Sequence, residues 1–244
     1  MRCVLLSLLA LAAGIELSHA AQRVVDIPTR PGITQRFLFD APAEPKAAVI
    51  LFAGGHGGLQ LDDAGTMRFG KGNFLVRSAP LFAAQQLAVA VIDAPSDRQS
   101  PPHLLGFRHT ADHAADVAAV IAWLRENTKG PVWLVGTSRG TQSAAAVATR
   151  LRGSDGPNGI VLTSTVVVDR RDVPVTDMAV DTLQIPVLIV HGSADDVVPV
   201  EHAHRIAGAA HNAELMVLEG APHQLRLHPG VVELALEWLD RRVL

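Results

Sequence analysis

Ser138 is the residue best placed to act as a nucleophile, because it stands in the pattern Gly-x-Ser-x-Gly as Gly136-Thr137-Ser138-Arg139-Gly140. Four apolar residues at 132–135 precede it and predict a buried strand, and the small residues at 144–146 predict a helix packed close to the sheet. A serine at such a sharp turn projects its hydroxyl above the sheet, and glycine two residues away on either side relieves the crowding. The same short pattern also occurs in ordinary turns, so the neighbouring strand and helix give it weight.

A serine hydroxyl becomes a useful nucleophile when a base takes its proton and a third group orients that base. Asp195 lies in a polar turn after a strand expected at 185–190, just before a helix that Pro199 helps to start. His223 follows the last expected strand, at 215–218. We therefore predict Asp195 as the acid and His223 as the base.

Other acids and histidines compete for these roles. Asp196 is the first substitute for the acid, and Asp169 or Asp172 are more distant ones. The alternative for Asp195 or Asp196 is that it merely caps the helix or solvates the turn. Among the remaining histidines, His191 is expected to support the acid turn.

Seven further histidines are expected at the surface or in packing: His103, His109, His113, His202, His204, His211 and His228. Two pairs among them, at 109 and 113 and at 202 and 204, are close enough in sequence to share a metal. Neither pair has a recurring acid or cysteine partner, so we predict no metal and no cofactor.

A glycine-rich segment, Ala53-Gly54-Gly55-His56-Gly57-Gly58, follows an apolar run at 47–52. Glycines there allow backbone N–H groups to approach a substrate closely. A phosphate-binding loop is the rival interpretation, but the segment lacks both the Lys-Ser ending of a P-loop and the Gly-x-Gly-x-x-Gly order. The loop continues to about Arg77, and loops of that length are more often functional than idle.

The elements that must position these residues alternate along the chain. Strands are expected at 47–52, 87–92, 132–135, 160–163, 185–190 and 215–218, and helices at 78–86, 112–127, after Ser138, at 200–209 and at 231–242. This alternation predicts a single α/β domain with a mostly parallel central sheet and helices on both faces. Two more strands, around 24–27 and 34–39 and broken by Pro28 and Pro31-Gly32, are expected to form an antiparallel hairpin at the sheet edge. In open sheets of this kind, ligands bind beyond the carboxyl ends of the strands, where the candidates lie.

Length and composition agree with one globular domain. The chain has 244 residues, of which 48% are hydrophobic and 18% charged, and its formal charge is −3. The chain has no excess of basic residues, which a protein that binds nucleic acid or an anionic membrane would be expected to have. Residues 166–184 are too few for a large lid domain.

Residues 1–20 are expected to be a secretory signal peptide, with the single folded domain at 21–244. Met1-Arg2 gives a positive start, Val4 to Ile15 is an apolar run, and Ser18-His19-Ala20 ends in small residues at a cleavage site. An uncleaved membrane anchor is the alternative, but that run is shorter than the roughly 20 residues of a span. We expect a periplasmic or secreted protein, and Cys3, the single cysteine, would be lost on cleavage.

Over residues 23–244 the chain resembles the α/β-hydrolase family, through the serine turn, the acid turn, the final histidine and the glycine loop in that family's order. The resemblance implies that Ser138 attacks an acyl carbonyl, that His223 accepts its proton and that Asp195 fixes the imidazole. It also implies an oxyanion hole with the backbone N–H of Arg139 as one donor. The glycine loop departs from the common His-Gly-Gly-Gly form, so Gly55 is the first choice for the second donor and His56 the reserve.

The resulting hypothesis is a secreted or periplasmic serine hydrolase that cleaves carboxylic esters through an acyl-enzyme on Ser138. A small or medium acyl ester is the expected substrate. No nucleic-acid partner is expected, nor a membrane partner after signal cleavage, and the sequence does not set the oligomeric state. Two alternatives remain: a peptidase or thioesterase with the same triad, or a non-catalytic exported binding protein on the same scaffold. Dehalogenation or epoxide opening would need a carboxylate at position 138.

Overall fold

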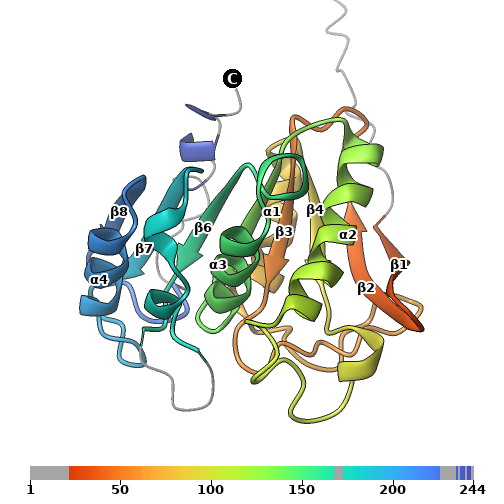
Figure 1. Ribbon diagram of the computed structural model, residues 1–244, viewed down its shortest axis with the longest axis horizontal. Coiled ribbons are helices and arrows are strands. Elements are labelled where there is room, and N and C mark those ends of the chain that lie inside the picture. The colour runs from red at the N-terminus through yellow and green to blue at the C-terminus, as the bar shows by residue number, and fades with distance from the viewer. Residues whose placement is uncertain (1–21, 168–172, 226–234, 236, 240, 243–244) are drawn as a thin grey trace, which may run out of the picture.

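Eight strands form one sheet in the part of the chain that the computed structural model describes, which is residues 22–167, 173–225, 235, 237–239 and 241–242. Their order across the sheet is β1-β2-β4-β3-β5-β6-β7-β8 (Figure 1). The strands are β1 (Arg23–Arg30), β2 (Ile33–Asp40), β3 (Ala47–Phe52), β4 (Leu87–Ile92), β5 (Val132–Thr137), β6 (Gly159–Thr163), β7 (Val187–Gly192) and β8 (Ala213–Leu218). The pairs β1–β2 and β2–β4 are antiparallel and the other five are parallel, which confirms the prediction of a mostly parallel sheet.

The inner strands are apolar because helices cover both faces of the sheet. Every residue of β3, β4, β5, β6 and β7 is buried, whereas β8 at the edge is half exposed. A strand buried on both faces has no position for a solvent-facing polar side chain, so its sequence is a continuous apolar run. The six predicted apolar strands therefore all appear in the sheet.

The predicted hairpin at the edge is present, but Pro28 does not break its first strand. β1 continues through Pro28 to Arg30, with a register shift between those two residues. Proline lacks a backbone N–H donor and is tolerated on an edge strand or at a bulge. Pro28 lies on an edge strand and beside a register shift. The break comes instead at the turn before β2, where Gly32 has a φ of +72°.

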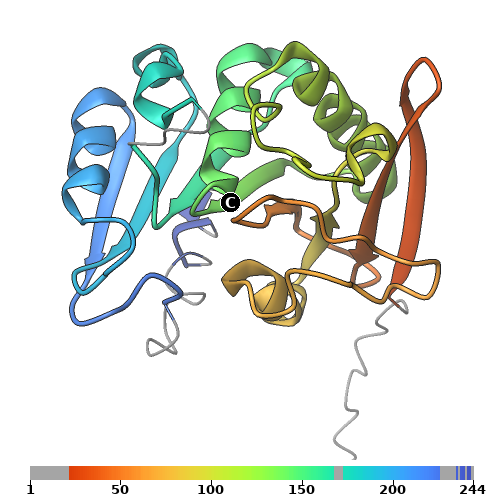
Figure 2. The same ribbon diagram turned by 90° about the horizontal axis from the view of Figure 1, so that it is seen from below.

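Helices α2 (Ala111–Thr128), α3 (Gly140–Arg150) and α4 (Glu201–Ala209) cover one face of the sheet, and α1 (Phe74–Ala84) covers the other (Figure 2). Residues 237–239 and 241–242 of the predicted last helix are helical, and the rest of that helix lies mostly outside the described residues. Trp238 packs against Trp133 of β5 with ring centroids 5.6 Å apart, on the α1 side. Helices on both faces were predicted and are confirmed.

The start of α1 differs from the prediction at 78. The helix begins at Phe74 because Asn73 caps it: the Asn73 side-chain oxygen accepts the Leu75 N–H at 3.1 Å. Pro80 consequently lies inside the helix and not in its first turn. An asparagine cap supplies an acceptor to the free N–H groups of the first turn, so it sets the start ahead of Ser78.

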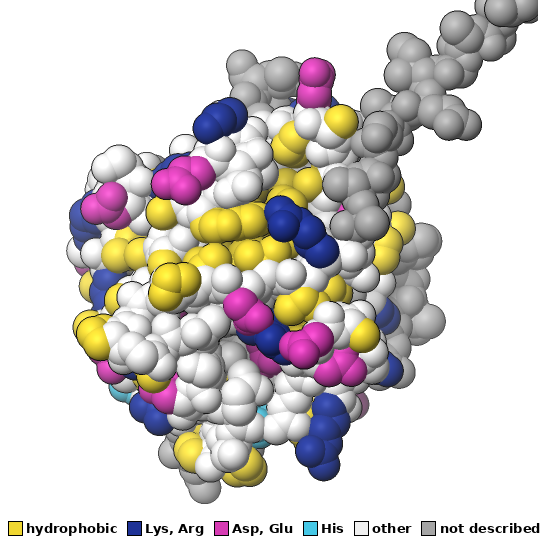
Figure 3. Space-filling view, turned by 90° about the vertical axis from the view of Figure 1, so that its right-hand side faces the viewer, with side chains coloured by type: hydrophobic (Ala, Val, Ile, Leu, Met, Phe, Trp, Pro, Cys, Tyr) yellow, Lys and Arg dark blue, Asp and Glu magenta, His cyan; other side chains and the backbone are white. Residues whose placement is uncertain are grey.

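The segment between β6 and β7 contains two short 3-10 turns, Val175–Asp177 and Val180–Thr182. Asp169 and Asp172, the distant substitutes for the acid, lie outside the described residues, as does the expected signal peptide at 1–20. Within the described part of the chain, no helix has the length and apolarity needed to cross a membrane. On the side of β1 and β2, hydrophobic side chains gather near the centre of the surface with charged side chains around them (Figure 3).

Candidate active site

Ser138 occupies the sharp turn between β5 and α3. Its φ is +51°, in the left-handed region that non-glycine residues rarely adopt, and its N–H donates to the carbonyl of Thr163 at 2.9 Å. A Cβ added to Gly136 would lie 2.5 Å from the carbonyl oxygen of Gly140, and one added to Gly140 would collide with the carbonyl of Phe52. Both flanking glycines are therefore required by space, as the pattern predicts.

Asp195 and His223 form a hydrogen-bonded pair at the carboxyl ends of β7 and β8. Nδ1 of His223 lies 2.8 Å from Oδ2 and 3.0 Å from Oδ1 of Asp195, and both residues are largely buried. A carboxylate accepts, so Nδ1 carries the proton in this pair. In the neutral imidazole, Nε2 is then the acceptor, which is the form that a general base needs.

The carboxylate of Asp195 is held ionised by its surroundings. Burial favours the neutral form, but hydrogen bonds from His191, His223 and the Val198 N–H outweigh it and hold the pKa of Asp195 below its ordinary value. Oδ1 also accepts the N–H of Val197 at 3.0 Å, so Asp195 both caps the turn and orients the histidine. The two roles that the sequence offered as alternatives are combined in one residue.

His191 supports the acid turn from within β7, which extends to Gly192, two residues beyond the predicted strand. Its Nε2 lies 2.8 Å from the carbonyl of Val198 and 3.3 Å from Oδ2 of Asp195. The strand begins and ends two residues later than predicted, and it pairs with β8 as far as Gly192 and Leu218. Asp196, the first substitute for the acid, is exposed.

The end of β6 connects the serine turn to the histidine loop. Thr163 accepts the backbone N–H of Ser138, and the next residue, Ser164, donates its hydroxyl to the carbonyl of His223 at 2.9 Å. Ser164 is fully buried, so this bond holds the histidine loop to the core. Ser138 and His223 are therefore attached to neighbouring residues at one end of the sheet.

The glycine loop lies against the serine. A Cβ added to Gly54 would be 3.0 Å from the Cβ of Ser138, and Gly55 has a φ of +65°. A cavity of about 380 Å³ is lined by this loop together with Asn73 and Gln224, the residue after His223. Arg139, the other predicted oxyanion donor, occupies the N-cap position of α3. The roles of Gly55 and Arg139 as oxyanion donors stay predictions.

Solved structures of similar fold are known. An esterase described as novel and cold-adapted, from an Arctic intertidal metagenomic library, superimposes with a TM-score of 0.67 at 18% identity over 91% of this chain and 93% of that one. Est1E from Butyrivibrio proteoclasticus gives 0.65 at 19% identity over 91% and 99%, and an alpha-beta serine hydrolase homologue from Coxiella burnetii gives 0.64 at 20% identity over 89% and 95%. This chain has the α/β-hydrolase fold. No family model and no curated protein matches its sequence.

In this α/β-hydrolase fold, two buried charges that the sequence analysis did not single out hold the glycine loop. The fully buried Arg108 donates from Nη2 to the carbonyl of Gly55 at 3.2 Å and lies 3.5 Å from that of Ala53. Asp93, after β4, accepts the N–H of Leu59 at 2.6 Å and that of Leu61 at 2.9 Å. Asp93 directly follows an apolar strand, a position at which the sequence could have indicated a functional residue. Arg108 lies in an irregular loop, and its neighbours in the sequence do not indicate a role.

His56 is part of the loop wall. Its ring stacks on His103 with centroids 4.3 Å apart, and its Nδ1 accepts the N–H of Gly58 at 3.1 Å. Burial, followed by the nearby His103 and Arg108, lowers the pKa of His56, which keeps the ring neutral. The reserve oxyanion donor therefore has its side chain engaged in packing the loop.

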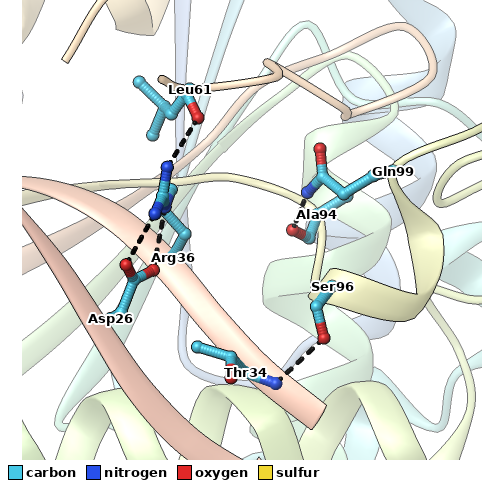
Figure 4. A pocket seen from close by; sticks show the side chains of 7 residues that line it. All are labelled: Asp26, Thr34, Arg36, Leu61, Ala94, Ser96 and Gln99. Atoms are coloured by element: carbon cyan, nitrogen blue, oxygen red, sulfur yellow. Dashed lines mark hydrogen bonds and ion pairs between the residues drawn. The ribbon is translucent and has the colours of Figure 1, made fainter. Parts of the chain in front are cut away.

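A second, larger hollow of about 480 Å³ lies between the β1–β2 hairpin and the segment after β4. Its polar groups bond to one another: Arg36 to Asp26 and to the carbonyl of Leu61, the Thr34 N–H to Ser96, and Gln99 to Ala94 (Figure 4). None of the lining residues belongs to the serine, acid or histidine turns. The cavity of about 380 Å³ is the better candidate for the reaction site because Gly54, which lines it, lies beside Ser138.

Metal chemistry has no evident place among the described residues. They contain no group of three His, Cys, Asp or Glu side chains able to hold a metal ion. Of the histidine pairs considered above, His113 is fully buried against Phe52 and Phe107, and Nδ1 of His202 accepts the N–H of Val167. Both of these side chains serve packing or backbone hydrogen bonding.

Proposed function

We propose that this protein is a serine hydrolase that cleaves carboxylic esters through an acyl-enzyme on Ser138. The observation that carries the proposal is the Asp195–His223 pair, 2.8 Å apart, at the same sheet end as the strained serine turn. If Asp195 only capped a turn, it would not need a histidine hydrogen-bonded to its carboxylate. If His223 were only a surface residue, it would not need a buried acid as its partner. The cold-adapted esterase from the Arctic library and the esterase domain of a Rhodothermus marinus protein share this fold, which supports the choice of ester.

In the proposed reaction, Oγ of Ser138 attacks the ester carbonyl while Nε2 of His223 takes the hydroxyl proton. Asp195 keeps Nδ1 protonated and stabilises the imidazolium that forms. The backbone N–H groups of Arg139 and Gly55 would stabilise the negative charge on the tetrahedral oxygen. His223 then gives its proton to the leaving alcohol, and water repeats the sequence on the acyl-enzyme to release the acid and free Ser138.

The size of the cavity favours a small or medium acyl group. Its volume of about 380 Å³ lies at the low end of ligand pockets, and the glycine loop contributes much of its lining. His223 itself, with Val197 and Pro222, lines a more apolar hollow of about 290 Å³. Since the histidine must reach the leaving oxygen, this hollow is the place that we propose for the alcohol part.

The test combines labelling with a substrate panel. A fluorophosphonate should label the protein once, at Ser138, and Ser138→Ala should abolish both labelling and hydrolysis of p-nitrophenyl acetate while retaining the wild-type circular dichroism spectrum and Tm. Full ester hydrolysis by Ser138→Ala would refute the proposal. Turnover of acyl thioesters or peptide amides, with none of esters, would replace the ester by the alternative substrate class.

We also propose that residues 1–20 are removed on export and that residues 21–244 act in the periplasm or outside the cell. The basis is the sequence pattern around Ser18-His19-Ala20. Expression in a bacterial host followed by N-terminal sequencing of the periplasmic fraction should give a chain beginning at Ala21. Recovery of the full-length chain in the cytoplasm alone would contradict this.

A further inference from the structure

Asn73 has a side-chain amide whose orientation is fixed. Its oxygen, Oδ1, accepts the N–H of Leu75 at 3.1 Å and thereby caps α1. An amide has its donor and acceptor on opposite sides of one carbon, so capping with the oxygen leaves Nδ2 with its two donors directed away from the helix. Asn73 is only partly exposed, and it lines the cavity beside the glycine loop.

Nδ2 of Asn73 and Cβ of Ser138 lie near the same point beside Gly54. The point that a Cβ of Gly54 would occupy lies 3.4 Å from Nδ2 of Asn73 and 3.0 Å from Cβ of Ser138. The two groups therefore flank one small space, which is open because residue 54 has no side chain. That space is bounded on a third side by the glycine loop, which contains the proposed donor Gly55.

We infer that the side-chain amide of Asn73 is a further catalytic residue, donating a hydrogen bond to the carbonyl oxygen of the substrate as it becomes negatively charged. The inference rests on the proposed function of Ser138. A donor that is already oriented by a cap needs no rearrangement when charge develops, which is the condition for strong transition-state stabilisation. Asn73 is neutral, so it adds a donor without introducing a charge that would bind the acid product.

The cap role and the donor role can be separated by substitution. Asn73→Ser and Asn73→Asp both retain a side-chain oxygen for the Leu75 N–H, and serine, aspartate and asparagine are about equally good caps. Neither can donate from the position of Nδ2. Asn73→Ser introduces no charge, so it controls for repulsion by the new carboxylate in Asn73→Asp, and Asn73→Ala removes both roles.

The measurements are kcat and KM for p-nitrophenyl acetate, Tm, and the inhibition constant of a trifluoromethyl ketone, which forms an oxyanion on the serine. We expect Asn73→Ser and Asn73→Asp to lower kcat by about 10²–10³-fold with KM changed less than about threefold, since this is the size of effect of losing one oxyanion donor. The inhibition constant should rise in proportion to the loss of kcat/KM, while Tm stays within a few degrees of wild type. A capping residue alone would not produce that proportionality.

Two results would overturn the inference. In the first, Asn73→Ser retains kcat within about threefold of wild type, even where Asn73→Asp is impaired, which would assign the loss to charge. In the second, kcat falls but the inhibition constant of the ketone does not change. Both results presuppose a wild-type protein that hydrolyses the ester and loses this activity in Ser138→Ala, so failure of the proposed function is seen separately.

Discussion

Arg108 and Asp93 bind the backbone of the same loop with opposite charges, the arginine at the carbonyls of residues 53 and 55 and the aspartate at the N–H groups of residues 59 and 61. Both side chains are buried. A carbonyl bound to a guanidinium and an N–H bound to a carboxylate cannot rotate without losing a charged hydrogen bond. The loop that is proposed to supply an oxyanion donor is therefore fixed before any substrate arrives.

Asp93→Asn should loosen this loop. The substitution replaces an acceptor oxygen by an NH₂ group that faces backbone N–H donors, so we expect about 2–4 kcal/mol less stability to unfolding in urea and a fall in kcat. Asp63→Asn is the matched control, because the Asp63 side chain is 95% exposed and is paired with Arg36 at the surface. Equal stability of the two variants would show that the buried carboxylate does not hold the loop.

Asp195→Asn should abolish most of the ester hydrolysis. An amide cannot keep the proton on Nδ1 of His223 or stabilise the imidazolium, and loss of this partner lowers kcat by about 10⁴-fold in triads of this type. The measurement is kcat at neutral pH, and Asp196→Asn, with an exposed side chain, is the comparison. The assignment of the acid would be reversed if Asp196→Asn were the inactive variant.

Gly54→Ala should reduce kcat/KM by at least about tenfold. The added methyl group would be 3.0 Å from both Cβ of Ser138 and the carbonyl oxygen of Thr137, so the serine turn must shift. Steady-state kinetics and Tm measure the two effects. Gly208→Ala in α4, where nothing lies within 4 Å of the new methyl group, should instead raise stability by about 0.5–1 kcal/mol and leave the kinetics unchanged. Unchanged kinetics in Gly54→Ala would show that the space beside Ser138 is not used.

His113→Phe should make the protein less sensitive to acid. Burial, followed by Arg108, lowers the pKa of His113 to about 3, and neither ring nitrogen has a hydrogen-bond partner among the described residues. Between about pH 6.5 and pH 3, this histidine is protonated in the unfolded chain, where its pKa is near 6.5, but stays neutral in the folded protein. Stability is therefore highest above pH 6.5 and falls as the pH decreases toward 3, by roughly 2–3 kcal/mol at pH 4.5 from this group alone.

The measurement for His113 is the urea unfolding free energy at pH 7 and at pH 4.5. The difference between the two should be smaller by that amount in His113→Phe, and the exposed His204→Phe should retain the wild-type difference. Identical pH dependence in all three proteins would contradict the depressed pKa. The phenyl ring replaces an imidazole already packed edge-on against Phe52 and Phe107, so folding at pH 7 should be retained.

The sheet and the serine turn were predictable because their causes are local. A buried strand such as β3 must be apolar at every position, and the turn at Ser138 needs glycine at 136 and 140. Asp195 and His223 were predictable from the rule that strand ends meet at one edge of the sheet. Their hydrogen bond joins residues 28 positions apart in the chain and is visible in the structure alone.

What escaped prediction depends on contacts between distant segments. In the sequence, nothing distinguishes Arg108 from other loop arginines. Its role follows from its contact with the glycine loop, where a Cβ on Gly57 would be 2.5 Å from its Nη2. The start of α1 was predicted at the wrong residue because Asn73 and Ser78, five positions apart, are both suitable caps, and sequence alone does not rank them. Pro28 was predicted to break the strand because proline lacks a backbone donor, whereas the register shift that accommodates it depends on the pairing with β2.

The position of Pro28 has a consequence for how the molecule behaves among copies of itself. β1 is the outermost strand of the sheet, and an outer strand offers unpaired backbone groups on which another polypeptide can assemble. The missing proline donor, the adjacent irregularity in pairing and the charged Arg23, Asp26 and Arg30 make that border a poor template. Extension of the sheet by a further strand is thus disfavoured at the edge farthest from β8.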